Sequence, residues 1–230
     1  MITGSGLIAN ALKESFNNDD SVLVFARGVS NSTCTDDTAY TKEFEMISSF
    51  AQNEANKIFV YFSTTSVFDT EKQHTKYVQE KLKFEQAIAS LFSKSIVIRL
   101  PIIVGRNNNE KQLFGYLLKA IKNNEYIRVH KYAGRYLIDV ADISGIVKRV
   151  IEFYKASKQN GNLTIDICGD HPIPITSIIT MLSKATKTEA KIVMEESGTT
   201  YFVDNSAIKA IVENQLLNKD FQKVFNDYFQ

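Results

Sequence analysis

Short apolar runs alternate with longer amphipathic stretches along the first half of this chain, and this alternation constrains the fold more than any other feature. The runs at 21–26, 57–62 and 95–100 are almost continuously hydrophobic and rich in β-branched and aromatic residues, which is typical of strands buried on both faces of a parallel sheet. The stretches at 39–55 and 74–92 space their apolar residues at helical intervals. Such alternation builds βαβ units. We therefore predict an α/β fold with a Rossmann-like, doubly wound parallel sheet.

The second half of the chain carries shorter and more mixed elements, and no linker-like stretch separates it from the first half. Periodicity predicts helices over 110–122, 142–155, 175–185 and near 205–212, and strands over 134–138 and 163–167. We expect a shortened dinucleotide-binding core over residues 1–105, followed by an intimately packed C-terminal substrate-binding part over residues 106–230.

Charge and composition exclude several classes of partner. The 27 Lys and Arg residues balance 26 Asp and Glu residues, so no broad electrostatic attraction draws the chain to nucleic acid or to an anionic membrane. Cys34 and Cys168 are too few for a disulfide framework, and the three histidines have no metal-ligand spacing. Neither a membrane-spanning run nor a leader-like segment is present. We expect a soluble, cytoplasmic protein without a metal site, and without nucleic acid or membrane as a partner.

A glycine-rich turn opens the chain. Gly4 to Ala9 matches the dinucleotide fingerprint G-x-G-x-x-[GA], in which the first glycine permits a tight turn and the second lets backbone approach a pyrophosphate. Only Met1 to Thr3 precede the turn, whereas a strand usually has about 5–6 residues, so a simple tight turn is the alternative. The candidate cofactor-binding residues are Gly4, Ser5, Gly6, Leu7 and Ile8.

A cofactor-reading residue is expected about twenty residues after such glycines, at the end of the next strand. No Asp or Glu stands there to bind a ribose 2′-hydroxyl, but Arg27 does, and a guanidinium suits a 2′-phosphate. The equally weighted alternative is a solvated arginine at a strand end. We therefore expect NAD or NADP as the cofactor, with Arg27 favouring NADP.

Tyr77 and Lys81 form a Y-x-x-x-K pair on a predicted helix, and four-residue spacing places both side chains on one helical face. A neighbouring ammonium lowers the pKa of a tyrosine, which is about 10 in water, and makes the phenol usable as a general acid/base. Directly upstream, the strand 57–62 runs into the hydroxyl cluster 63–66. In a doubly wound sheet, that strand end faces the same crevice as the glycine turn.

In this order, the motifs resemble the extended branch of the short-chain dehydrogenase/reductase superfamily, the NAD-dependent epimerase/dehydratase family that acts on nucleotide sugars. Two further segments are similar to motifs of that family: 99–105 to R-x-P-x-x-x-G, and 135–142 to R-D-x-x-x-V-x-D. The resemblance covers most of residues 1–185. It implies a Rossmann fold, a nicotinamide cofactor and a nucleotide-sugar substrate.

The resemblance also implies roles for individual residues. Tyr77 would move a proton on a sugar hydroxyl or ketone, while Lys81 would hold the nicotinamide ribose and lower the pKa of the tyrosine. Thr64 would hydrogen-bond the same sugar oxygen. Arg135 would pair with the substrate diphosphate, unless it is simply a surface charge. The remaining implied contacts are those of Thr65 with the substrate and of Ser63, Leu100 and Ile103 with the cofactor.

The chain departs from the family pattern between the glycine turn and the hydroxyl cluster. Only the strand at 22–26 and one helix lie there, where the family places more βα units. That strand could instead correspond to a later family strand, whose end touches the cofactor near its middle; Arg27 would then say nothing about a 2′-phosphate. Thr65 and Ser66 stand where dehydratases of this branch carry an Asp-Glu pair, which disfavours dehydration.

These observations lead us to expect an NAD(P)-dependent epimerase or 4-keto-reductase acting on a nucleotide-activated sugar. The alternatives are a non-catalytic dinucleotide- or nucleotide-sugar-binding protein on the same fold, and a Rossmann-like domain with coincidental motifs. For the oligomeric state, one hypothesis is a homodimer that pairs through the helices at 39–55 and 74–92. Packing on the sheet explains their apolar stripes more simply.

Overall fold

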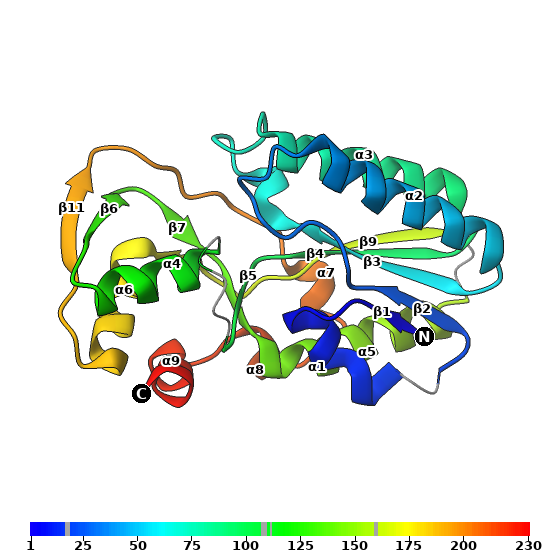
Figure 1. Ribbon diagram of the computed structural model, residues 1–230. Helices are drawn as coiled ribbons and strands as arrows, with labels where there is room; N and C mark the ends of the chain where they lie inside the picture. The colour runs from blue at the N-terminus through cyan, green and yellow to red at the C-terminus, as the bar shows by residue number, and fades with distance from the viewer. Residues whose placement is uncertain (17–18, 107–109, 111, 159–160) are drawn as a thin grey trace.

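A five-stranded parallel sheet lies at the centre of the computed structural model, which describes residues 1–16, 19–106, 110, 112–158 and 161–230 (Figure 1). The strand order is β1-β2-β3-β4-β9, and every neighbouring pair is parallel. The strands are β1 (Ile2–Thr3), β2 (Val22–Phe25), β3 (Ile58–Thr64), β4 (Ser95–Leu100) and β9 (Asn162–Asp166). The predicted α/β, Rossmann-like parallel sheet is confirmed.

Helices cover both faces of this sheet (Figure 1). Successive side chains of a strand point to opposite faces, so Val22 and Val24 pack with the α1 and α5 layer, whereas Leu23 and Phe25 pack with the α2 and α3 layer. This two-sided burial is the reason why the strands have continuous hydrophobic sequences. The four helices are α1 (Leu7–Phe16), α2 (Asp37–Asn53), α3 (Lys76–Leu91) and α5 (Val140–Ala156).

The first crossover of the sheet has an unusual hand. A doubly wound sheet carries helices on both faces because its strand order reverses at a switch point, and right-handed connections then change face. Here the order runs from β1 to β4 without reversal, yet α1 lies on the opposite face from α2 and α3. The β1–α1–β2 connection therefore has the opposite hand to the β2–α2–β3 connection.

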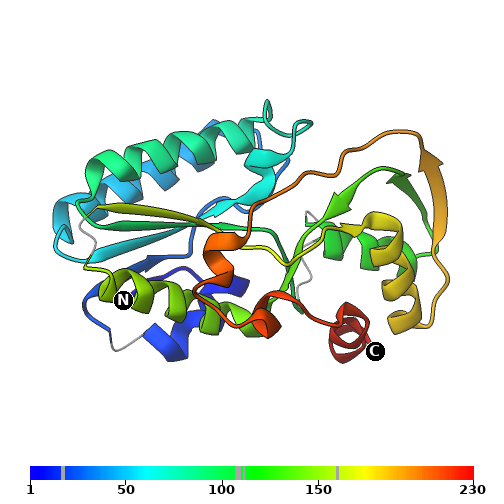
Figure 2. The same ribbon diagram turned by 180° about the vertical axis from the view of Figure 1, so that it is seen from behind.

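The C-terminal part packs around its own apolar cluster, which α4 (Leu113–Lys122), α6 (Ile175–Thr186) and α9 (Phe221–Phe229) share with strand β6. Strand β6 (Tyr126–His130) pairs in parallel with β11 (Lys191–Glu195). In Figure 2, α7 and α8 (orange to red-orange) lie beside the central sheet, and the chain then continues to α9 (red) in the C-terminal part. The remaining short elements are η1 (Thr65–Phe68), β5 (Ile102–Val104), β7 (Gly134–Arg135), β8 (Leu137–Asp139), β10 (Ile173–Pro174), α7 (Ser206–Lys209) and α8 (Asn214–Leu217).

The central sheet draws on both sides of the division expected at residue 105, because α5 and β9 come from the second half of the chain. In the part of the chain that the structure describes, no helix is both long and apolar enough to cross a membrane. The same residues contain no group of three or more His, Cys, Asp or Glu side chains arranged to hold a metal ion.

Candidate functional site

A cavity of about 1120 Å³ lies at the carboxyl ends of β1, β2, β3 and β4, where the sheet meets the C-terminal part. This is the edge at which a doubly wound sheet binds ligands. Segments from 4 to 201 meet here, so distant parts of the sequence share one site. Every residue predicted for the site lines this cavity: Gly4, Ser5, Gly6, Leu7, Ile8, Arg27, Ser63, Thr64, Thr65, Tyr77, Lys81, Leu100, Ile103 and Arg135.

The glycine turn has the geometry of its fingerprint. Gly4 has a φ of +116°, and a Cβ there would lie 2.2 Å from the carbonyl oxygen of Ala26, so only glycine fits. Ala9 is fully buried below the turn. A Cβ on Gly6 would meet nothing within 4 Å, which leaves that backbone open to a ligand at the start of α1. The Gly4, Gly6 and Ala9 positions thus keep the three separate functions of the motif.

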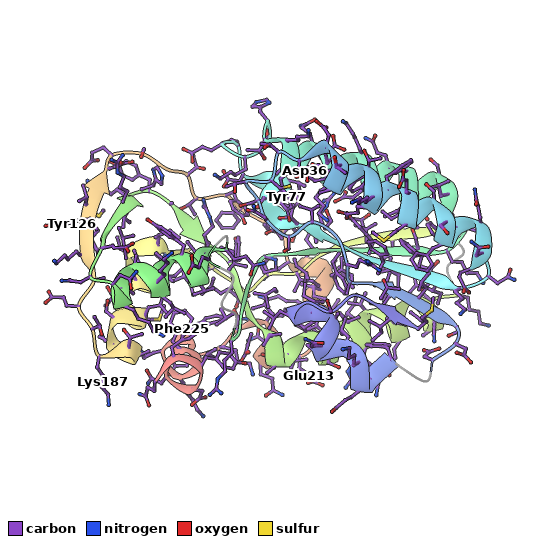
Figure 3. All side chains as sticks on the ribbon, viewed as in Figure 1. Asp36, Tyr77, Tyr126, Lys187, Glu213 and Phe225 are labelled. Atoms are coloured by element: carbon purple, nitrogen blue, oxygen red, sulfur yellow. The ribbon has the colours of Figure 1, made fainter. Side chains whose placement is uncertain are left out.

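Tyr77 (labelled in Figure 3) lies near the start of α3 and Thr64 ends β3, and both line the cavity. The Thr64 hydroxyl accepts a hydrogen bond from the backbone N–H of Ser66 at 3.1 Å. Burial raises the pKa of Tyr77 to about 12, and the hydrogen bond with Thr64 opposes that rise. Tyr77 therefore holds its proton at neutral pH.

In the free protein burial, and not Lys81, dominates the pKa of Tyr77, and the role that the resemblance implies for Lys81 remains a prediction. Its Nζ donates to Glu43 Oε1 at 3.0 Å and to Tyr61 Oη at 2.8 Å, and the Lys81 and Glu43 side chains are each 2% exposed. Burial lowers the pKa of Lys81, while Glu43 opposes this effect. The negative charge of Glu43 therefore offsets the positive charge of the Lys81 ammonium near the phenol of Tyr77.

Glu43 is the most important site residue that the sequence analysis missed. Its Oε2 accepts the backbone N–H of Val29 at 2.7 Å, and its Oε1 accepts the hydroxyl of Tyr61 at 2.7 Å. The signal was present in the sequence, since Glu43 stands on the same helical stripe as Tyr40 and Ile47, both of which are buried. A carboxylate within an apolar stripe needs a buried partner, and Lys81 is that partner.

The hydroxyls of Ser63 and Thr65 are engaged in bonds within the protein. Ser63 donates to Glu85, whose carboxylate also binds the guanidinium of Arg99. Thr65 Oγ1 lies 3.1 Å from the hydroxyl of Tyr201, a second residue that sequence reasoning missed. Tyr201 lies in an irregular segment without periodicity, so no pattern marked it. These hydroxyls brace the end of β3, and ligand contacts by them remain a prediction.

Arg135 projects toward the cavity from the C-terminal part and is anchored there. Its Nη2 lies 3.5 Å from Asp69 Oδ2, and its Nη1 donates to the carbonyl oxygens of Gly134 and Thr199. Asp69 itself is 1% exposed and accepts a hydrogen bond from the Thr199 hydroxyl. A guanidinium carries five N–H donors, so Arg135 keeps donors that could face an anionic ligand.

Arg27 occupies a different place from the one that favoured NADP. It follows β2, and β2 lies between β1 and β3 rather than on the far side of β1. Its exposed side chain lines the cavity beside the glycine turn. This is the strand position that the alternative interpretation described, so the basis for favouring NADP is removed. Leu100 and Ile103, on neighbouring strands, give the cavity an apolar wall.

Comparison with known proteins gives matches among solved structures only. No family model matches the chain, and no curated protein matches its sequence. Among solved structures, it is similar to a UDP-glucuronic acid 4-epimerase from Bacillus cereus in complex with UDP-glucuronic acid and NAD, with 17% identity and a TM-score of 0.69, covering 98% of this chain and 78% of that one.

Two further structures give the same result. WbmH from Bordetella bronchiseptica, in complex with NAD⁺, has 12% identity and a TM-score of 0.73, and the match covers 99% of this chain and 80% of that one. The UDP-Glc/GlcNAc 4-epimerase from Campylobacter jejuni has 15% identity and a TM-score of 0.68, with 96% and 80% covered. The chain therefore has the fold of these structures, and it spans about four fifths of their length.

Proposed function

We propose that this protein is an NAD-dependent enzyme that acts on a nucleotide-activated sugar, as an epimerase or as a 4-keto-reductase. The observation that carries the proposal is the pairing of Thr64 with Tyr77 on the wall of a cavity that the glycine turn also lines. Solved structures with this fold were determined with NAD and UDP-sugars. A pure binding protein has no need for a threonine and a tyrosine placed side by side on that wall.

The residues at the glycine turn fit the diphosphate of a dinucleotide. The open space over Gly6 is a cradle that a Cβ would begin to fill, and the N-terminus of α1 supplies free N–H groups there. When bound, the nicotinamide ring would supply hydride transfer to or from a sugar carbon. Leu100 and Ile103 would exclude water from the nicotinamide end of the cavity.

Tyr77 would handle the proton at its phenol oxygen. With a pKa of about 12, the phenol is protonated at neutral pH, so in the free protein it is ready to donate a proton to the oxygen of a keto sugar. Thr64 would orient that same oxygen by a hydrogen bond. Arg135 would bind the substrate diphosphate with the donors that Asp69 and Thr199 leave available.

The direct test is Tyr77→Phe, with UDP-sugars and their 4-keto forms as substrates. Chromatography of the product sugars measures epimerisation, which uses no net NADH, and NADH absorbance measures keto reduction. Loss of one positioned acid/base costs about 10²–10⁴-fold in rate, and we expect kcat to fall by that amount with NADH affinity unchanged. Tyr126→Phe is the matched control, because Tyr126 is 69% exposed on β6, outside the cavity. A Tyr77→Phe enzyme that keeps more than a few percent of the wild-type rate would overturn the assignment.

The burial of Lys81 favours a second candidate, a non-catalytic protein that binds a dinucleotide or a nucleotide sugar. Two of its three N–H donors are engaged by Glu43 and Tyr61, whereas a catalytic role requires contact with the nicotinamide ribose. Tight binding of NADH and a UDP-sugar without any turnover would establish this candidate.

A further inference from the structure

The sheet ends at β1 in the part of the chain that the structure describes, and this edge is where the strands that bind the adenosine of a dinucleotide would lie. In a doubly wound fold, the dinucleotide lies across the point where strand order reverses, and strands on the far side of the first strand bind its adenosine. Among the residues that the structure describes, nothing pairs with the far edge of β1. The sheet therefore lacks the reversal that would place strands beside an adenosine.

The missing strands cannot lie between α1 and β2. Helix α1 ends at Phe16 and β2 begins at Val22, so only residues 17–21 connect them. A parallel crossover needs a dozen or more residues. The position of α1 supports the same conclusion. If the connection after α1 had the same hand as β2–α2–β3, it would lead to a strand beyond β1 and not to β2. The helix has the place it would have in a full doubly wound sheet, while the described residues form no strand beyond β1.

The cavity also has fewer lining residues on its β1 side than on its β3–β4 side. On the β1 side it contains Gly4 to Ile8 and then nothing before Phe25. On the other side it is built from the ends of β2, β3 and β4 together with 112–116, Arg135 and Tyr201. The residue about twenty positions after the glycines, which would read the adenosine ribose, is Arg27, and it lies between the glycine turn and β3.

We infer that this chain holds its cofactor through the nicotinamide nucleotide and the diphosphate, and that neither the adenine nor the adenosine 2′-position is recognised. Arg27 is then a positioning residue for the diphosphate. Its side chain is exposed, it makes no hydrogen bond or ion pair with any residue that the structure describes, and its neighbour Ala26 lies against Gly4. This inference rests on the proposed function, since it concerns the same site.

The test compares the affinities of four reduced probes, measured by nicotinamide fluorescence: NADH, NADPH, nicotinamide guanine dinucleotide and nicotinamide mononucleotide. The first three keep the diphosphate, and we expect their Kd values to agree within about threefold. The mononucleotide loses one phosphate, and we expect it to bind less than about tenfold more weakly, which corresponds to about 1.4 kcal/mol. Adenosine 2′,5′-bisphosphate should not displace NADH.

A preference of more than about tenfold for NADH over the guanine dinucleotide, or for either of NADH and NADPH over the other, would overturn the inference while supporting the proposed function. Displacement of NADH by adenosine 2′,5′-bisphosphate would do the same. Binding of none of the four probes would overturn the proposed function, and the inference with it.

The role of Arg27 is tested with Arg27→Gln. We expect the Kd values for NADH and NADPH to rise by the same factor, about three- to tenfold, because both cofactors share the diphosphate. The control is Arg128→Gln, since Arg128 is exposed on β6 and lies outside the cavity lining. A selective loss of NADPH affinity would return Arg27 to a 2′-phosphate and contradict the inference.

Discussion

The two sides of the cavity differ in how much structure supports them. On the β3–α3 side, the candidate residues stand in front of two buried polar networks, one around Lys81 and Glu43 and one around Glu85 and Arg99. On the β1–α1 side, a two-residue strand lies at the sheet edge and carries the glycine turn. Burying ionised groups is costly unless they are paired. The buried ion pairs thus lie on the side where the proposed proton transfer would occur. The side where the cofactor diphosphate would bind has only a two-residue strand.

The largest test of this contrast is to break the Lys81–Glu43 pair. Glu43→Leu would leave the Lys81 ammonium buried without a partner, and we expect the free energy of unfolding to fall by about 3–5 kcal/mol. Urea denaturation measures this change. The control is Glu152→Gln, which removes the solvent-exposed pairs with Lys148 and Arg149 and should cost less than about 1 kcal/mol.

The double variant Glu43→Leu with Lys81→Met sharpens the same test. Replacing a buried ion pair by apolar residues of similar volume is often neutral or stabilising, so most of the lost stability should return. A Glu43→Leu protein as stable as the wild type would show that the Lys81 ammonium does not depend on Glu43 as its partner.

On the other side of the cavity, the matched pair is Gly4→Ala and Gly6→Ala. Gly4 combines a positive φ with contact to Ala26, so alanine there should lower the free energy of unfolding by about 1–3 kcal/mol. Gly6 has open space around it, and its alanine variant should change stability by less than about 0.5 kcal/mol while weakening NADH binding. Thermal unfolding and NADH titration separate the two effects. Equal losses of stability would contradict the different roles of the two glycines.

The last prediction concerns the change of kcat/KM per pH unit that follows from the pKa of Tyr77. Because burial raises the pKa of Tyr77 to about 12, the phenolate fraction grows about tenfold per pH unit below that value. We expect kcat/KM for sugar oxidation to rise with this slope from pH 7 to 10, since oxidation needs the phenolate. Reduction of a keto sugar needs the protonated phenol and should stay flat over the same range. An oxidation profile that levels off below pH 9 would contradict the raised pKa in the free protein.

Much of this architecture could be predicted because it is written in local patterns. Strands buried on both faces have continuous apolar sequences, so the runs at 21–26, 57–62 and 95–100 marked β2, β3 and β4. The ends of parallel strands meet at one edge of a sheet, which is why motifs from Gly4 to Arg135 converge on a single cavity.

What the sequence analysis could not decide depends on pairing between distant segments. No local pattern says whether the run at 21–26 pairs with β3 or lies beyond β1, and the meaning of Arg27 follows from that choice. Strands β6 and β11 pair across some sixty residues, and neither was predicted. Tyr201 was missed for a related reason, since it acquires its role only from the partner that tertiary packing brings to it. Glu43 differs, because its place on an apolar helical stripe was a readable signal, and only the identity of its partner Lys81 depended on tertiary packing.

The reversed first crossover also makes this chain a convenient scaffold for protein engineering. Helix α1 already lies on the face from which a chain would continue outward past β1, and it packs there against α5. A strand–helix–strand segment grafted between Phe16 and Val22 would therefore extend the sheet without moving α1. Such a graft would add an adenosine-reading edge to a sheet that otherwise ends at β1 in the part of the chain that the structure describes, and cofactor preference could be chosen by the residue placed at the end of the new strand.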